Sequence, residues 1–115
     1  MNLPDQIPKR LRDSAIILPE FDDNEGAWFK TDAIAVIKSL KGTDVSISDV
    51  LIHNMALRGY TQSEPVLSVR RFPNENDSDY SVRSLSLALD FIRNFETADE
   101  KTLFSLRFPL WKDAA

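Results

Sequence analysis

His53 is the only histidine in the sequence, and histidine is the side chain whose charge changes most readily near neutral pH. With Asp49 and a serine, it could form a Ser-His-Asp arrangement for nucleophilic catalysis. However, the sequence has no G-x-S-x-G segment that would expose a serine on a strained turn. A zinc site would need several histidine or cysteine ligands, and cysteine is absent. We therefore interpret His53 as a structural or surface residue, and we predict no enzymatic activity, no metal and no cofactor.

Acidic side chains gather in two stretches that could recognise a partner. The first is residues 19–27, PEFDDNEGA, whose turn-forming residues predict a loop. This stretch does not fit an EF-hand calcium loop, because aligning Gly26 with the required glycine puts Phe21 at the first ligand position. The second stretch precedes a long predicted helix, where acids also complement the helix dipole. The residues predicted to contact a partner are Glu20, Asp22, Asp23, Glu25, Glu75, Asp77 and Asp79.

The composition predicts one globular domain over residues 1–115, because 43% of the residues are apolar and 28% are charged. The net charge of −4, with the basic residues scattered, argues against a nucleic-acid partner and permits a basic protein partner. No apolar run approaches the roughly 20 residues that span a bilayer, and the first residues lack the pattern of a signal peptide. With no cysteine for disulfides, these features predict a cytoplasmic protein without membrane association.

Helical periodicity is strongest in residues 77–96, where Asp77, Ser78 and Asp79 are suited to cap the first turn. Its predicted apolar stripe is Val82, Leu85, Leu89, Ile92 and Phe95. A second helix is predicted to begin at Thr31 as its N-cap and to end near Gly42. The apolar face of this second helix is Ala33, Val36, Ile37 and Leu40. A third, short helix is predicted over residues 8–16.

Three stretches have the alternation of strands: residues 45–53, 65–72 and 102–110. The first changes phase at Asp49, which predicts either a β-bulge or the end of the strand there. The short connection to the second stretch predicts an antiparallel hairpin. Pro109 cannot donate to a β-ladder, so the last strand should end there or lie at an edge of the sheet.

These elements predict an α+β fold with two layers, in which three helices pack on one face of about three mainly antiparallel strands. The other face of this sheet would carry polar side chains, among them Ser105 and Arg107. We expect that face to be solvated or covered by a partner.

Several short motifs resemble the polymorphic-toxin immunity family called immunity protein 40. They are Trp28, Asp32-Ala33, Asp49-Val50 and Arg83-Ser84, and the similarity covers roughly residues 26–95. Ile47 and Ser48 depart from the pattern, because glycines would stand there. The resemblance implies a cytosolic antitoxin that binds a secreted toxin and blocks it without catalysis. Many such toxins are basic enzymes, for which acidic groups on an inhibitor would speed encounter.

A second class of function fits the same composition. Small acidic α+β chaperones or adaptors bind a protein partner and often dimerise through a helix or a sheet face. Leu87 and Phe91, on a different face of the long predicted helix from its main stripe, or the strand that ends at Pro109, could form such an interface. The sequence therefore leaves monomer and homodimer open, and a sizing column with light scattering would distinguish them.

Overall fold

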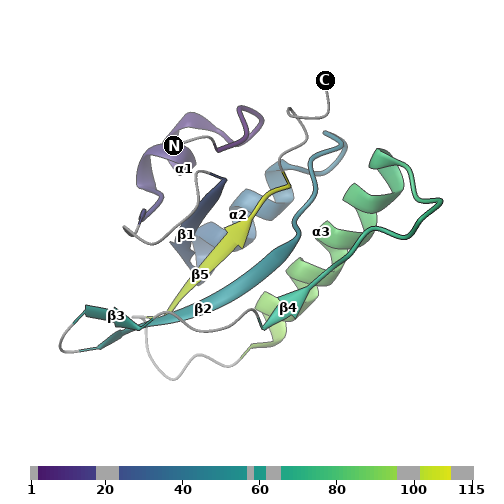
Figure 1. The fold of residues 1–115 in the computed structure, drawn as a ribbon. Coiled ribbons are helices and arrows are strands. Elements are labelled where there is room, and N and C mark those ends of the chain that lie inside the picture. The colour runs from purple at the N-terminus through teal and green to yellow at the C-terminus, as the bar shows by residue number, and fades with distance from the viewer. Residues whose placement is uncertain (1–2, 18–23, 57–58, 62–65, 96–101, 110–115) are drawn as a thin grey trace.

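The computed structural model describes residues 3–17, 24–56, 59–61, 66–95 and 102–109 of the chain. Its elements, in chain order, are α1 (Lys9–Ser14), β1 (Glu25–Phe29), α2 (Lys30–Ser39), β2 (Asp49–Ala56), β3 (Gly59–Thr61), β4 (Leu67–Ser68), α3 (Asp77–Asn94) and β5 (Thr102–Arg107). The strands form one antiparallel sheet in the order β1-β5-β2-β3, and β4 pairs with the same edge of β2 as β3 does (Figure 1). None of the helices in the described ranges is long and apolar enough to cross a membrane.

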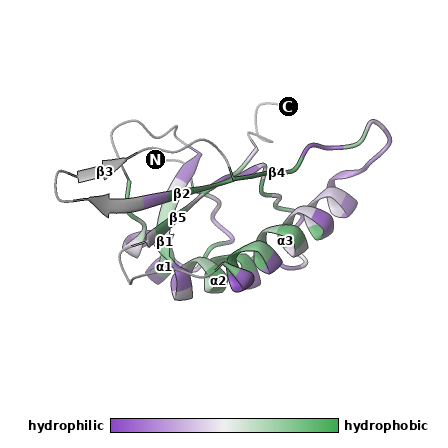
Figure 2. Cartoon of the chain, turned by 90° about the horizontal axis from the view of Figure 1, so that it is seen from below, coloured by the Kyte–Doolittle hydropathy of each residue, from purple (hydrophilic) through white to green (hydrophobic). Residues whose placement is uncertain are grey.

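The helices lie together on one side of the sheet, which Figure 2 shows from below. The side chains between the layers form one buried cluster. Its largest members are Ile7, Leu11, Trp28, Ile37, Leu40, Ile47, Ile92, Phe104, Leu106 and Phe108. The predicted α+β class is thus confirmed, with five short strands in place of about three.

The last strand, β5, lies in the middle of the sheet between β1 and β2. The prediction that this strand joins an edge was wrong, whereas the alternative that it ends before Pro109 was right. Because β5 ends at Arg107, the missing N–H of the proline lies outside the ladder and does not prevent pairing on both sides. This central strand is buried along nearly its whole length.

Strand β1 was not predicted, because residues 19–27 read as a loop. Five residues, EGAWF, pair with β5 from Glu25↔Arg107 to Phe29↔Leu103. Strand β2 begins at Asp49, which explains the change of phase there: residues 45–48 precede the strand, so neither a bulge nor a strand end occurs at Asp49. The predicted antiparallel pairing of the first and second stretches, residues 45–53 and 65–72, is confirmed by Asp49↔Ser68 and Val50↔Leu67.

The face of the sheet turned away from the helices is also buried along its centre. Phe104 and Leu106 belong to the cluster under the helices, so the alternating residues Leu103 and Ser105 point to the opposite side. Their partners on β2, His53 and Leu51, do the same. All four of these opposite-face side chains are almost fully inaccessible. The expectation of a solvated face was therefore wrong for Ser105.

Helix α3 is capped by Asn76, whose side-chain oxygen accepts a hydrogen bond from the backbone N–H of Asp79 at 2.8 Å. The cap thus lies one residue before the predicted group. The buried face of helix α3 consists of Tyr80, Ser81, Ser84, Leu85, Ala88, Leu89 and Ile92. Val82, which was predicted to be in this stripe, is 65% exposed. At the start of α3 the small side chains of Ser81 and Ser84 face the sheet and let the helix approach it closely. The buried stripe of the helix is therefore rotated away from Val82 in this part.

Helix α2 buries Ala33, Val36, Ile37 and Leu40, as predicted. The predicted cap at Thr31 was wrong: the residue at the N-cap is Phe29, without a side-chain cap. The helix gives way to a turn that contains two residues in the left-handed region, Gly42 at φ 81° and Asp44 at φ 64°. Glycine adopts this conformation at little cost, which supports its predicted role at the end of the helix.

Candidate functional site

The seven acidic residues predicted to contact a partner occupy different environments. Glu20, Asp22 and Asp23 lie outside the described residues. Glu25 lies in β1 rather than in a loop, and its side chain is fully buried. The second stretch, Glu75, Asp77 and Asp79, lies together at the start of α3.

Glu25 is held inside the sheet by a polar network. Its carboxylate pairs with Arg107, whose Nε lies 3.1 Å from Oε1, and accepts a hydrogen bond from Ser105 Oγ at 3.0 Å. The same Ser105 oxygen lies 3.2 Å from His53 Nε2. Because the serine donates its proton to Glu25, the imidazole contributes the proton in the contact with Ser105.

This network does not form the nucleophilic arrangement considered for His53. Asp49 lies on the same strand four residues away, a separation of about 13 Å along β2. Ser105 is fully buried and gives its proton to a carboxylate, so it is not placed to attack a substrate. In the part of the chain that the structure describes, no three histidine, aspartate or glutamate side chains come together to hold a metal.

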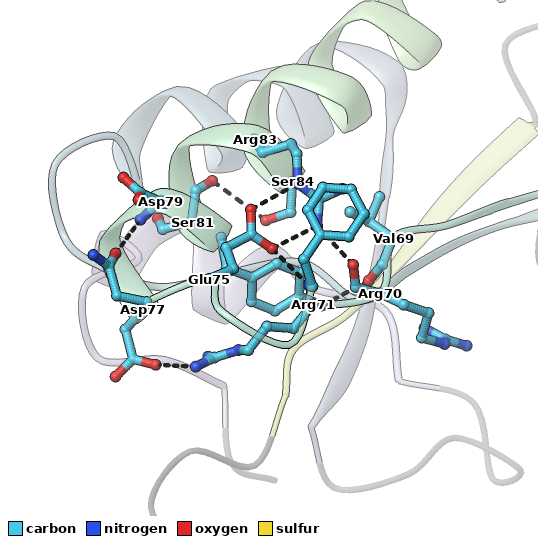
Figure 3. A network of polar contacts seen from close by, with 12 residues as sticks. Val69, Arg70, Arg71, Glu75, Asp77, Asp79, Ser81, Arg83 and Ser84 are labelled. Carbon is cyan, nitrogen blue, oxygen red and sulfur yellow. Dashed lines mark hydrogen bonds and ion pairs between the residues drawn. The ribbon is translucent and has the colours of Figure 1, made fainter.

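The start of α3 carries a different network, drawn in Figure 3. Arg83 binds Glu75 through two nearly parallel hydrogen bonds, Nε to Oε2 at 2.8 Å and Nη2 to Oε1 at 2.7 Å. Arg83 also donates to the carbonyl of Arg70 at 2.6 Å, while the backbone N–H of Phe72 donates to Glu75 at 3.0 Å. The hydrogen bonds from Arg83 lower the pKa of Glu75 to about 2, and the Glu75 carboxylate in turn raises the pKa of Arg83.

Aromatic rings complete this corner. The guanidinium of Arg83 lies 4.1 Å from the centre of the Phe72 ring, and that of Arg71 lies 5.0 Å from the centre of the Tyr80 ring. The Tyr80 hydroxyl donates to the carbonyl of Val69 at 2.7 Å, and burial raises its pKa. Phe72 is nevertheless 59% exposed, so its outer face is available to a partner.

The acids of this corner are therefore neutralised to different degrees. Glu75 is committed to Arg83 and has a largely covered side chain. Asp77 pairs with Arg71 at 2.6 Å but stays largely exposed. Asp79 is exposed, and its carboxylate has no hydrogen-bond or ion-pair partner among the described residues. Only Asp77 and Asp79 thus remain accessible to a partner in this stretch.

The Glu75–Arg83 pair predicts a specific acid sensitivity. A carboxyl whose pKa is lower in the folded chain stabilises the fold above its unfolded pKa, about 4.3, and loses that contribution as the pH falls toward 2. We expect Glu75→Gln to lower Tm at pH 7, and the difference from the native chain to shrink between pH 4.5 and 2. Circular dichroism melts across this range measure it. A constant difference at every pH would show that the carboxylate charge is not responsible.

The turn after α2 separates two hollows beside α3. One, of about 320 Å³, is lined by Lys41, Gly42, Val82, Leu85, Ser86 and Leu89. The other, of about 180 Å³, is lined by Gln6, Thr43, Asp44, Val45, Ser46, Arg71, Asp77 and Pro109. Sequence reasoning predicted neither. A signal was present in Val82, an apolar residue in the second turn of α3, but its periodicity alone assigned it to the core.

The residues that carry the sequence resemblance connect elements of the fold. The indole N–H of Trp28 donates to the carbonyl of Leu11 at 2.8 Å, which ties β1 to α1. Ser84 accepts a hydrogen bond from the backbone N–H of Ile47 at 3.0 Å, which ties α3 to the segment before β2. Arg83 ties α3 to the segment after β4.

Asp49 joins β2 to β4 in the same way. It accepts hydrogen bonds from Ser68 at 2.7 Å, from Ser48 at 3.0 Å and from Arg70 at 3.2 Å. Burial raises the pKa of Asp49, but these hydrogen bonds outweigh the effect and the net shift is downward. Trp28, Asp49, Arg83 and Ser84 thus have structural roles.

Comparison with known proteins gives one match. The family model described as "Immunity protein 40" matches residues 17–108, which is most of the chain. No curated protein and no solved structure gives a significant match.

Proposed function

Since this chain belongs to the immunity protein 40 family, we propose that it binds a cognate bacterial toxin and neutralises it without catalysis. The observation that carries the proposal is the match over residues 17–108, which includes both layers of the fold. The motif residues Trp28, Asp49 and Arg83 are the ones that join these layers and strands, so the match concerns a whole scaffold rather than one short segment.

The polar side chains also support inhibition by contact. Ser105 and His53, which could suggest chemistry, are buried in the sheet, where Ser105 contacts both His53 and Glu25. A protein that acts by occupying a toxin surface needs no reactive group, only a stable shape with exposed contacts. We propose that the chain does this in the cytoplasm of the producing cell.

The proposed partner is a toxin with a basic surface. The chain has a net charge of −4, and exposed carboxylates lie at Asp44, Asp77 and Asp79. Complementary charge speeds association and fixes the orientation of the encounter, more than it adds to affinity. Glu20, Asp22 and Asp23 remain part of this proposal, whereas Glu25 and Glu75 would act through the fold, because both are already paired with arginines.

Co-expression tests the proposal directly. A candidate toxin domain, chosen from the genes that flank the one for this chain, is induced in a bacterial host with and without this chain, and we expect growth to be restored only when the chain is present. The matched control is Ile37→Asp, which places a charge at a fully buried position and prevents folding. Equal killing with the native chain and the control would contradict the proposed function.

A further inference from the structure

The smaller of the two hollows lies between the turn after α2 and the start of α3, and its lining is mostly polar. Its volume is about 180 Å³, which is below the range of pockets for small-molecule ligands and suits the end of one long side chain. The polar residues that line it are Gln6, Thr43, Asp44, Ser46, Arg71 and Asp77. Because polar groups taken out of water need partners, this polar hollow favours an occupant that forms hydrogen bonds.

The charges that line the polar hollow do not balance. Asp77 forms an ion pair with Arg71, in which Oδ1 lies 2.6 Å from Nη1 (Figure 3). Asp44 lines the same hollow, and its exposed carboxylate has no hydrogen-bond or ion-pair partner among the described residues. Two carboxylates and one guanidinium give the lining a formal charge of −1. The polar hollow therefore attracts a cation rather than an anion.

Ser46 is an independent sign that the polar hollow takes a ligand. The residue is only 5% exposed, and it lines the hollow, whereas its neighbours Val45 and Ile47 belong to the apolar cluster. Its hydroxyl has no hydrogen-bond partner among the described residues. Most buried polar side chains in proteins do have such a partner. The hydroxyl of Ser46 is thus an open hydrogen-bonding position that an occupant of the hollow can fill.

We infer that the polar hollow receives a basic side chain of the toxin. The cationic group meets the carboxylate of Asp44 and the second carboxylate oxygen of Asp77, and it donates a hydrogen bond to the hydroxyl of Ser46. Arginine fits best, because its planar head carries five N–H donors, enough for both carboxylates and the hydroxyl. This inference rests on the proposed function and deepens it, since it assigns one contact point to the basic partner.

Calorimetry with the purified candidate toxin domain of the co-expression test measures the role of Asp44. Asp44→Asn removes the unpaired charge, and asparagine tolerates the left-handed φ of 64° at this residue. We expect about tenfold weaker binding, as for one lost hydrogen bond between charged groups, and a native Tm. The matched control is Asp90→Asn, which removes the same charge at an exposed position about 20 Å from Asp77 along α3. We expect this control to bind within about twofold of the native chain, because only the net charge changes.

Ser46→Ala tests the hydroxyl separately from the charge. The change removes a buried group that has no partner among the described residues, so we expect the Tm to stay the same or to rise. We expect binding to weaken about fivefold, since the toxin loses one hydrogen bond. A lower Tm with native affinity would show that the hydroxyl serves the fold and would remove it from the inferred contact.

Arg71→Gln distinguishes a basic occupant from an acidic one. The change removes the counter-charge of Asp77, so a basic side chain of the toxin should bind as well as before or more tightly. Weaker binding by Arg71→Gln, together with native affinity for Asp44→Asn, would assign the polar hollow to an acidic side chain and overturn the inference.

A small probe tests the polar hollow without the toxin. Arginine amide is titrated into the native chain, and NMR follows the backbone N–H signals of residues 43–46. We expect these signals to shift saturably with arginine amide and not with propionate, and we expect Asp44→Asn to abolish the shift. A response to propionate alone, or no saturable response to arginine amide, would contradict a cation site.

The outcomes separate this inference from the proposed function. Native affinity of the toxin domain for Asp44→Asn, or equal weakening by Asp90→Asn, would overturn the assignment of the polar hollow while leaving the immunity function in place. A native chain that neither binds nor neutralises any candidate toxin domain from the flanking genes would overturn both.

Discussion

Replacing Trp28 with alanine is expected to destabilise the protein by about 3–5 kcal/mol, as is typical when a large buried aromatic residue is removed. The side chain is almost fully buried in the centre of the cluster and is one of its largest members. It also covers Gly26, where an added Cβ would lie 3.1 Å from the Trp28 ring and 3.2 Å from Leu3. The loss would remove much of the 5–15 kcal/mol that stabilises a domain of this size.

Trp28→Phe separates packing from hydrogen bonding at the same position. Phenylalanine keeps most of the apolar contact but cannot donate to the carbonyl of Leu11, which the indole contacts at 2.8 Å. We expect a cost of about 1–3 kcal/mol, the penalty for an unsatisfied buried carbonyl. Urea unfolding curves measure both variants. A loss below about 1 kcal/mol for Trp28→Ala would show that the residue does not hold α1 against β1.

The helices could be predicted from the sequence because their information is local. Helix α2 turns a continuous apolar face to the sheet, so the spacing of Ala33, Val36, Ile37 and Leu40 alone identifies it. In α3 the same rule holds from Leu85 onward and fails at Val82. There the helix approaches the sheet through two serines that hydrogen-bond to backbone groups, and periodicity does not detect polar residues used in this way.

The strands were harder to predict because their partners are distant in the chain. Strand β1 has five residues, including a glutamate and a glycine, and it is a strand because β5 pairs with it about 80 residues later. The position of β5 at the centre follows from the same pairing. A pattern within ten residues does not contain this information.

The candidate site depended on pairings of the same kind. Two acidic stretches looked equivalent in the sequence. In the structure, however, Glu25 is buried in an ion pair with Arg107, and Glu75 is paired with Arg83. Asp44 and Asp79, by contrast, have no such arginine among the described residues. Charge counts identified the type of partner that the sequence permits, whereas the structure was needed to identify which charges are available.

Arg107→Ala is expected to destabilise the protein by about 3 kcal/mol, because it removes the arginine that forms an ion pair with the buried Glu25 carboxylate. The arginine side chain is 26% exposed and the glutamate side chain 0%, so the effect should lie at the lower end of the range for buried pairs. In a Glu25→Gln background, the same change should cost only about 1 kcal/mol, since a neutral amide needs no counter-charge.

The native chain, Arg107→Ala, Glu25→Gln and the double variant form a double-mutant cycle. This cycle isolates the interaction between the two side chains. Urea unfolding gives each free energy, and equal m-values would show that the variants unfold from comparable states. The matched control is Lys9→Ala, which breaks an exposed pair with Asp13 and should change the free energy by less than about 0.5 kcal/mol. If Arg107→Ala costs the same with glutamate or glutamine at residue 25, the two charges are not coupled. The burial of Glu25 would then have to be explained by its other contacts, the hydrogen bond from Ser105 first among them.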